Sequence, residues 1–340
     1  MREEKIKPGK KLTKGSPQRQ GKKKGLSPAR KRERKITCWV KKEQIQGHDI
    51  DVNIQNILIQ CSAWGSPHKG KPFASHKLCH GLPEAYLSER HEKWMAEYGR
   101  SFNAAGNRGY SLSINEFVDQ TNEFKAYRNG YGRPQKLKSR KQTSFRHENV
   151  TSLPASIDWR KRGTVTPIKD QAQCELVDCD KGVDQGCEDG EMEDEFEFRI
   201  RNHGIASEAT YPYKGDDGTC NKSNEASHAA TISGYGIVPA NNEQALQKAV
   251  ANQPVSVSID AGGYAFQFYS RGIFTGECGT KLDHGITAVG YGTSEDCIDY
   301  WLIKNSWGTG WGEKGYIMMQ RNIKAKGLCG IAMDYSYPTV

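Results

Sequence analysis

The stretch Lys304-Asn305-Ser306-Trp307-Gly308-Thr309-Gly310-Trp311-Gly312 decides the fold class of this chain. It separates two short apolar runs, residues 300–303 and 316–319, whose aromatic and β-branched content predicts strands. Upstream, the Val-Ser-Val-Ser-Ile run of residues 255–259 alternates apolar and polar side chains, and residues 286–289 form a further β-branched run. The last third of the chain therefore predicts an antiparallel sheet.

Helices are expected ahead of and within this sheet region. Met192, Phe196 and Ile200 recur every four residues, which is the stripe of an amphipathic helix. Residues 242–251 place four apolar side chains on one helical side, and residues 110–114 alternate as a short strand does. A helical part followed by an antiparallel sheet predicts an α+β fold.

The positive charge of the chain gathers at one end. Of the formal net charge of +9, residues 1–42 contribute 17 Lys and Arg against 3 Glu, so the remainder is acidic. Residues 1–35 lack aromatic side chains and are predicted to be disordered, since they cannot bury enough apolar surface. This tail could attract polyanions. Without interleaved aromatics, no specific nucleic-acid recognition is expected.

Cysteines and sequons point to an oxidising compartment. Seven of the ten cysteines lie between residues 174 and 329, a density typical of secreted or lumenal domains. The sequons at Asn149 and Asn221 predict glycosylation there. No signal peptide is recognised at the N-terminus, and no apolar run is long enough to predict a membrane span. No cysteine spacing matches a zinc motif, so neither a metal nor another cofactor is expected.

Two polar residues flank the predicted strands. His284 opens one strand, and Asn305 follows the strand that ends at Lys304. If the two strands are neighbours, the amide oxygen of Asn305 can fix the imidazole tautomer and leave the other ring nitrogen as a base or ion-pair partner. A lone histidine at a strand start is more often structural, so the surrounding sequence has to decide.

The chain resembles the papain-like cysteine proteases of the plant type in eight blocks that occur in order. These blocks are residues 153–160, 171–174, 176–180, 186–187, 211–213, 283–285, 305–312 and 329–330. The resemblance implies a fold of two lobes, one helical and one a sheet or barrel. It divides the chain into a basic extension (1–85), a truncated inhibitory propeptide with a linker (86–150) and a peptidase domain (151–340).

The resemblance also implies a role for each matching position. His284 would be the general base, Asn305 the residue that orients it, and Gln171 the oxyanion-hole donor. Trp307 would shield the His–Asn bond, and Gly190 and Gly285 would line the substrate cleft. The implied disulfides are Cys174–Cys187, Cys179–Cys220 and Cys278–Cys329, with Cys297 outside these pairs.

The nucleophile of the family is missing from its expected place. These enzymes carry a C-G-[SA]-C-[WY] block about 130–150 residues before the histidine. Here residues 171–174 read Gln-Ala-Gln-Cys and continue with Glu-Leu-Val, only 110 residues before His284. We expect the catalytic cysteine and the central helix of the helical lobe to be absent. Neither Cys174 nor Cys179 is expected at a helix N-terminus, the setting that lowers a thiol pKa.

The remaining helix carries charges where the family has apolar or small residues. Glu191, Glu195 and Arg199 flank the predicted apolar stripe. Glu195 and Arg199 are four residues apart and could pair with each other. The propeptide-like region also lacks a long helix, because residues 98–102 run directly into residues 103–106.

Three functions remain open from the sequence. The first is a cysteine endopeptidase acting as a monomer on peptides or proteins in a vacuole, a lysosome or outside the cell. The second is a catalytically impaired relative, either a non-catalytic peptide binder or an incomplete gene product. The third is a polyanion binder that acts through the basic tail. The absent Cys-Trp block favours the second by chemistry, whereas lineage favours the first.

Overall fold

The computed structural model describes residues 93, 96–106, 108–117, 144–170, 174–180, 190–214 and 218–340. The predicted N-terminal extension, residues 1–85, lies outside these residues. Residues 96–104 are helical. Among the described residues, no helix is both long and apolar enough to cross a membrane.

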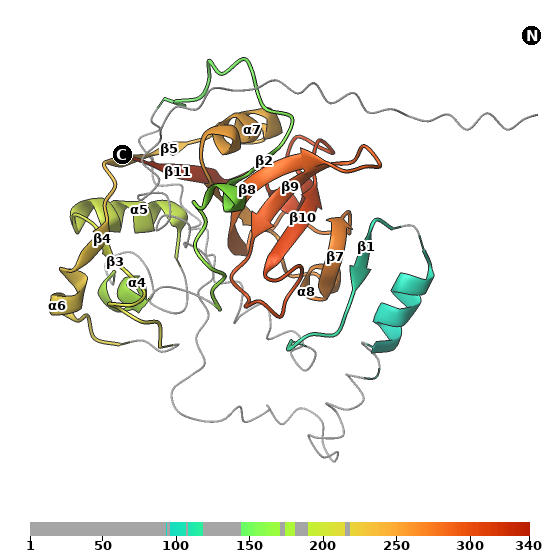
Figure 1. The fold of residues 1–340 in the computed structure, drawn as a ribbon, viewed down its shortest axis with the longest axis horizontal. Coiled ribbons are helices and arrows are strands. Elements are labelled where there is room, and N and C mark those ends of the chain that lie inside the picture. Colours follow the sequence, from blue (N-terminus) through green and yellow to red (C-terminus); the bar gives the residue numbers. More distant parts are fainter. Residues whose placement is uncertain are drawn as a thin grey trace, which may run out of the picture. The chain divides into compact units, whose positions relative to one another are not determined.

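A sheet of nine strands forms the framework of the C-terminal half (Figure 1). Its members are β1 (Tyr110–Leu112), β2 (Ile157–Asp158), β5 (Gly234–Ile237), β6 (Val255–Ile259), β7 (Tyr269–Phe274), β8 (His284–Thr293), β9 (Asp299–Lys304), β10 (Tyr316–Gln320) and β11 (Tyr335–Thr339). The strand order is β1-β7-β10-β9-β8-β6-β11-β5, and β2 pairs with β8. At that crossing, a side chain at Gly290 would lie 2.2 Å from the Ile157 carbonyl oxygen, so only glycine fits.

The sheet is antiparallel apart from one pair, as β7 and β10 run parallel. The sequence predicted an antiparallel sheet, and this pair is the exception to it. Parallel neighbours need a crossover connection. The chain segment that leads from β7 to β10, which includes the β8–β9 hairpin, supplies it. All the other pairs of the sheet are antiparallel, as predicted.

One large apolar core lies against this sheet. It includes three fully buried tryptophans, Trp301, Trp307 and Trp311. Helix α7 (Glu243–Asn252) contacts β6 and β8, and it begins where Asn242 accepts a hydrogen bond from the Ala245 amide. Two short helices, α8 (Tyr264–Gln267) and η2 (Leu328–Gly330), lie in the connections between strands.

The helical lobe is small. It contains α4 (Cys174–Cys179), α5 (Met192–Arg201), α6 (Lys222–Glu225) and the hairpin of β3 (Ile205–Ala206) with β4 (His228–Ala230). Helix α5 matches the prediction from residues 192–200 and contacts β5 and β11. The two-lobe α+β architecture expected from the sequence is therefore present.

The apolar core of the helical lobe is divided. The described residues form separate clusters, the largest made of Leu176, Val177, Phe198, Ile205 and Ala230. Charged side chains are buried in this lobe as well. Glu193, Glu195 and Arg199 are each no more than 2% exposed, and Glu195 pairs with Arg199 as the spacing predicted.

Candidate active site

The β8–β9 pairing brings His284 and Asn305 together. His284 is the first residue of β8, and Asn305 directly follows β9. Because the strands are antiparallel neighbours, with Thr287 opposite Lys304, the start of β8 lies beside the end of β9. His284 Nε2 lies 2.8 Å from Asn305 Oδ1, and both side chains are buried.

The amide of Asn305 is held in one orientation. Its Oδ1 also accepts a hydrogen bond from the Ser306 backbone amide at 2.8 Å. An oxygen that receives two donors cannot be exchanged for the amide nitrogen without placing donors against each other. His284 Nε2 must therefore carry the proton, which leaves Nδ1 of the neutral ring as the basic nitrogen.

Trp307 covers this pair. Its ring stacks on the His284 imidazole, with centroids 4.8 Å apart and an interplanar angle of 28°. Phe266 and Trp311 pack on Trp307 at 5.4 and 5.2 Å. The indole is fully buried, so it excludes water from the His–Asn hydrogen bond and strengthens that bond.

Lys304 is a buried cation that the sequence reasoning did not single out. Its ammonium donates to Thr166 Oγ1 at 2.8 Å. Burial and the charge of Lys169 lower the pKa of Lys304 to about 7. The only sequence signal is its place at the end of an apolar strand. No feature of the sequence predicted that the backbone amide of Ser306 would hold the Asn305 side chain.

Two of the implied disulfides are present, Cys179–Cys220 and Cys278–Cys329. Cys187 lies outside the described residues, so the third pair is not described. Cys174 differs from expectation because it is the first residue of α4 and thus stands at a helix N-terminus. Residues 175–179 continue that helix directly.

The remaining predicted site residues are distributed as follows. Gly285 is buried on β8 beside His284, and Gly190 is partly exposed just ahead of α5. Gln171 lies outside the described residues. The two sequon asparagines, Asn149 and Asn221, are both exposed. Asn221 Oδ1 also accepts hydrogen bonds from the first turn of α6.

The propeptide-like segment reaches into the same core. Strand β1 pairs with β7, and Phe117 lies edge-on to Trp307 with centroids 5.8 Å apart.

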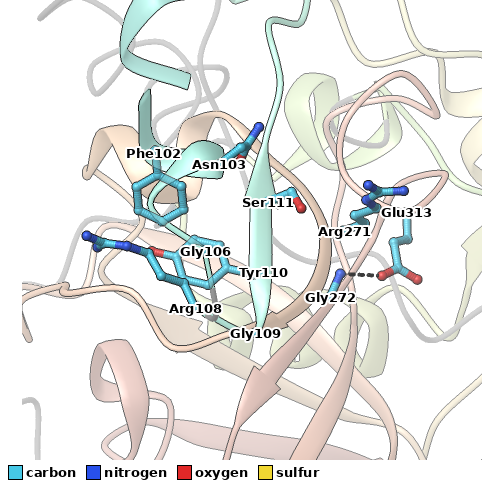
Figure 2. Close-up of a pocket in the computed structure, with 10 residues that line it drawn as sticks. All are labelled: Phe102, Asn103, Gly106, Arg108, Gly109, Tyr110, Ser111, Arg271, Gly272 and Glu313. Carbon is cyan, nitrogen blue, oxygen red and sulfur yellow. Dashed lines mark hydrogen bonds between the residues drawn. The ribbon is translucent and has the colours of Figure 1, made fainter. Parts of the chain in front are cut away.

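A pocket of about 420 Å³ lies where this segment meets β7, with Phe102 and Tyr110 on one side and Arg271 and Glu313 on the other (Figure 2). The Gly272 amide donates to Glu313 there at 2.8 Å. This pocket shares no lining residue with the His284 site.

An imidazole held by an amide and covered by an indole, in a protein with a helical lobe and a sheet lobe, is the arrangement that the resemblance to the thiol proteases predicted. The profile described as "Papain family cysteine protease" matches residues 175–339. Together with the relatives below, this match establishes that the chain belongs to the papain family of cysteine proteases, which act on peptides or proteins.

The similar proteins include plant proteases. Senescence-specific cysteine protease SAG39 of Oryza sativa subsp. japonica is 46% identical over 313 residues, covering 75% of this chain and 91% of the relative. Senescence-specific cysteine protease SAG12 of Arabidopsis thaliana is 43% identical over 317 residues, covering 76% and 91%. Among solved structures, the proform of the ragweed pollen cysteine protease Amb a 11 is 36% identical, with a TM-score of 0.69, and covers 78% of this chain and 82% of that chain.

Proposed function

We propose that this chain is a papain-family protein that has lost peptide-bond hydrolysis because its nucleophilic cysteine and the helix carrying it are absent. The observation that carries the proposal is the sequence Gln171-Ala-Gln-Cys-Glu175, in which helix α4 begins immediately. The His284–Asn305 pair then forms an oriented base with no thiol to activate, and an acyl-enzyme cannot form.

The length of the alignment supports a deletion. The rice relative aligns over 313 residues, yet 75% of the 340-residue chain is only about 255 residues. The difference of about 58 positions corresponds to gaps in this chain. A deletion at residue 174 and another near residue 102 would account for them, and both places were marked by the sequence.

Five cysteines in the described part of the chain cannot replace the missing nucleophile. Cys179, Cys220, Cys278 and Cys329 are in disulfides. Cys297 lies beyond the far end of the ten-residue strand β8, about 30 Å from His284 at 3.3 Å per residue. Cys174, the first residue of α4, is therefore the cysteine to test.

The deciding experiment is covalent labelling with a peptidyl epoxide. We expect no His284-dependent labelling and no turnover of a fluorogenic peptide. Cys174→Ser, Cys297→Ser and His284→Ala are the matched variants. Labelling of Cys174 that disappears in His284→Ala, together with turnover, would overturn the proposal.

A chimera supplies the positive control. The segment of the rice relative that has no counterpart in this chain after Cys174 is inserted between Cys174 and Glu175. The insertion is designed to restore a Cys-Trp block. Activity in this chimera would establish that His284, Asn305 and Gln171 remain competent. Inactivity of the folded chimera would place the defect elsewhere in the chain and contradict the stated cause.

Peptide binding without hydrolysis is the residual activity we propose, with a cleft at the partly exposed Gly190, whereas Gly285 and Trp307 are buried. Titration with a substrate-like peptide aldehyde tests it, and the chimera serves as reference. Polyanion binding through residues 1–42 is the alternative. In that case, deleting those residues should abolish the binding and its salt dependence.

We further propose that the protein is a glycosylated monomer of zymogen-like organisation in a vacuole, a lysosome or outside the cell. The disulfides and the exposure of Asn149 and Asn221 support this assignment. Asn149→Gln and Asn221→Gln should each remove one glycan from protein made in plant cells, as read by mass spectrometry. An unchanged mass in both would contradict it.

A further inference from the structure

Residues 144–150 form a strap that precedes the peptidase domain and docks on β11; it belongs to the green stretch beside α7 in Figure 1. Within the strap, Phe145 packs against the main core, and His147 is only 9% exposed. The imidazole lies 5.8 Å from the Phe145 ring and 5.2 Å from the Tyr337 ring, measured between centroids. The strap therefore adheres to the domain chiefly through aromatic contacts.

Two hydrogen bonds add to these contacts. The Arg146 backbone amide donates to the Tyr337 hydroxyl at 3.1 Å. From α7, the Lys248 ammonium donates to the Glu148 carbonyl at 2.7 Å. The first bond is partly buried and the second is exposed to solvent. Water can therefore replace either partner at little cost in free energy.

His147 is the buried titratable group of the strap. Its Nε2 is buried and has no hydrogen-bond partner among the described residues. The charge that acts on His147 is the Arg146 guanidinium in the strap. The Lys248 ammonium from α7 is bound to the Glu148 carbonyl, and the Glu148 side chain is exposed. From β11 it faces the Tyr337 phenol, whose pKa is raised by burial, so that it stays neutral.

We propose that protonation of His147 releases the strap from β11, so that the strap acts as a latch operated by pH at the junction with the N-terminal region. A docked imidazolium would lack an acceptor for Nε2–H and would stand beside Arg146, whereas a released one is hydrated. The pKa of His147 is correspondingly lowered, first by burial and then by Arg146. Docking is thus strongest above the ordinary histidine pKa near 6.5. It weakens as the pH falls through the lower pKa of the docked imidazole.

The test is hydrogen–deuterium exchange of the full chain at pH 7.5 and 5.0, corrected for intrinsic exchange rates. Peptides covering residues 144–150 report the strap, and peptides covering β6 report global unfolding. We expect strap protection to fall several-fold at the lower pH, because protonation of His147 favours the released strap. Protection of β6 should not change.

Two variants assign the effect to His147. His147→Phe keeps the aromatic contacts without a titrating group, so its strap should stay protected at both pH values. Arg146→Gln removes the neighbouring cation and should make the loss smaller. Unchanged wild-type protection, tighter docking at the lower pH, or an equal loss in His147→Phe would each overturn the proposal. If β6 also exchanges at pH 5.0, the comparison is made at the lowest pH where β6 stays protected.

Discussion

Glu195 and Arg199 form an ion pair on α5 in which the side chains are only 3% and 1% exposed. Both residues belong to the ten-residue helix α5 of the helical lobe. Burial raises the pKa of Glu195, and the Arg199 charge opposes that rise. The pair keeps two charges in the protein interior, where each depends on the other.

Breaking this pair should be far more damaging than replacing it. Arg199→Met leaves Glu195 buried without its cation, and we expect a loss of about 3–5 kcal/mol in the free energy of unfolding. The double variant Glu195→Met/Arg199→Met should be neutral or more stable than the wild type. Urea titration followed by circular dichroism measures both. Equal losses in the single and the double variant would refute the interpretation.

The stability of the helical lobe should decrease between about pH 4.5 and pH 7. Glu175 accepts hydrogen bonds from the Ala206 and Asn202 nitrogens, and burial raises its pKa to about 7. The folded state therefore holds a proton that the unfolded state has released, so stability falls as the pH rises through this window. A shift of that size corresponds to about 3 kcal/mol at most.

Glu175→Gln mimics the protonated carboxyl and is the matched variant for the range between about pH 4.5 and pH 7. Its free energy of unfolding should vary less with pH between 4.5 and 7 than that of the wild type. An identical pH profile would contradict the assignment to Glu175.

The opposite trend should appear at higher pH. Lys304 has a pKa of about 7 in the folded protein, below its ordinary value of about 10.5. Between these values the unfolded state binds more protons, so stability rises with pH. Lys304→Met should remove that rise, whereas Lys161→Met, at an exposed position, should not. Denaturant titrations from pH 7 to pH 10 check this, and a rise that persists in Lys304→Met would exclude Lys304 as its cause.

The helical lobe should open before the sheet lobe. Its core is divided among small clusters, and the Cys179–Cys220 disulfide closes 41 residues of it. A cross-link over a loop of that size is worth about 4 kcal/mol. In Cys179→Ser/Cys220→Ser, amide exchange should accelerate in α4 to β4 first. The matched Cys278→Ser/Cys329→Ser variant should instead affect η2 and its neighbours, and the same pattern in both would argue against separate opening.

Local pattern was sufficient for much of the sheet lobe. Residues 255–259 form β6 with the predicted limits, and the four-residue stripe from Met192 correctly marked α5. Alternation nevertheless predicts one exposed face on β6, whereas all five of its residues are buried. Ser258 contacts Met192 of α5, so the helical lobe covers the face that the pattern predicted to be polar and exposed.

By itself, the sequence determined the family and the two residues of the His284–Asn305 pair, because motifs such as residues 305–312 are local features of the chain. The tertiary structure decided what burial does to charges. It places Glu175, Glu195, Lys304 and His147 in the interior, and desolvation by burial is the largest cause of each of their pKa shifts. Such shifts depend on packing across elements, which no pattern of adjacent residues encodes.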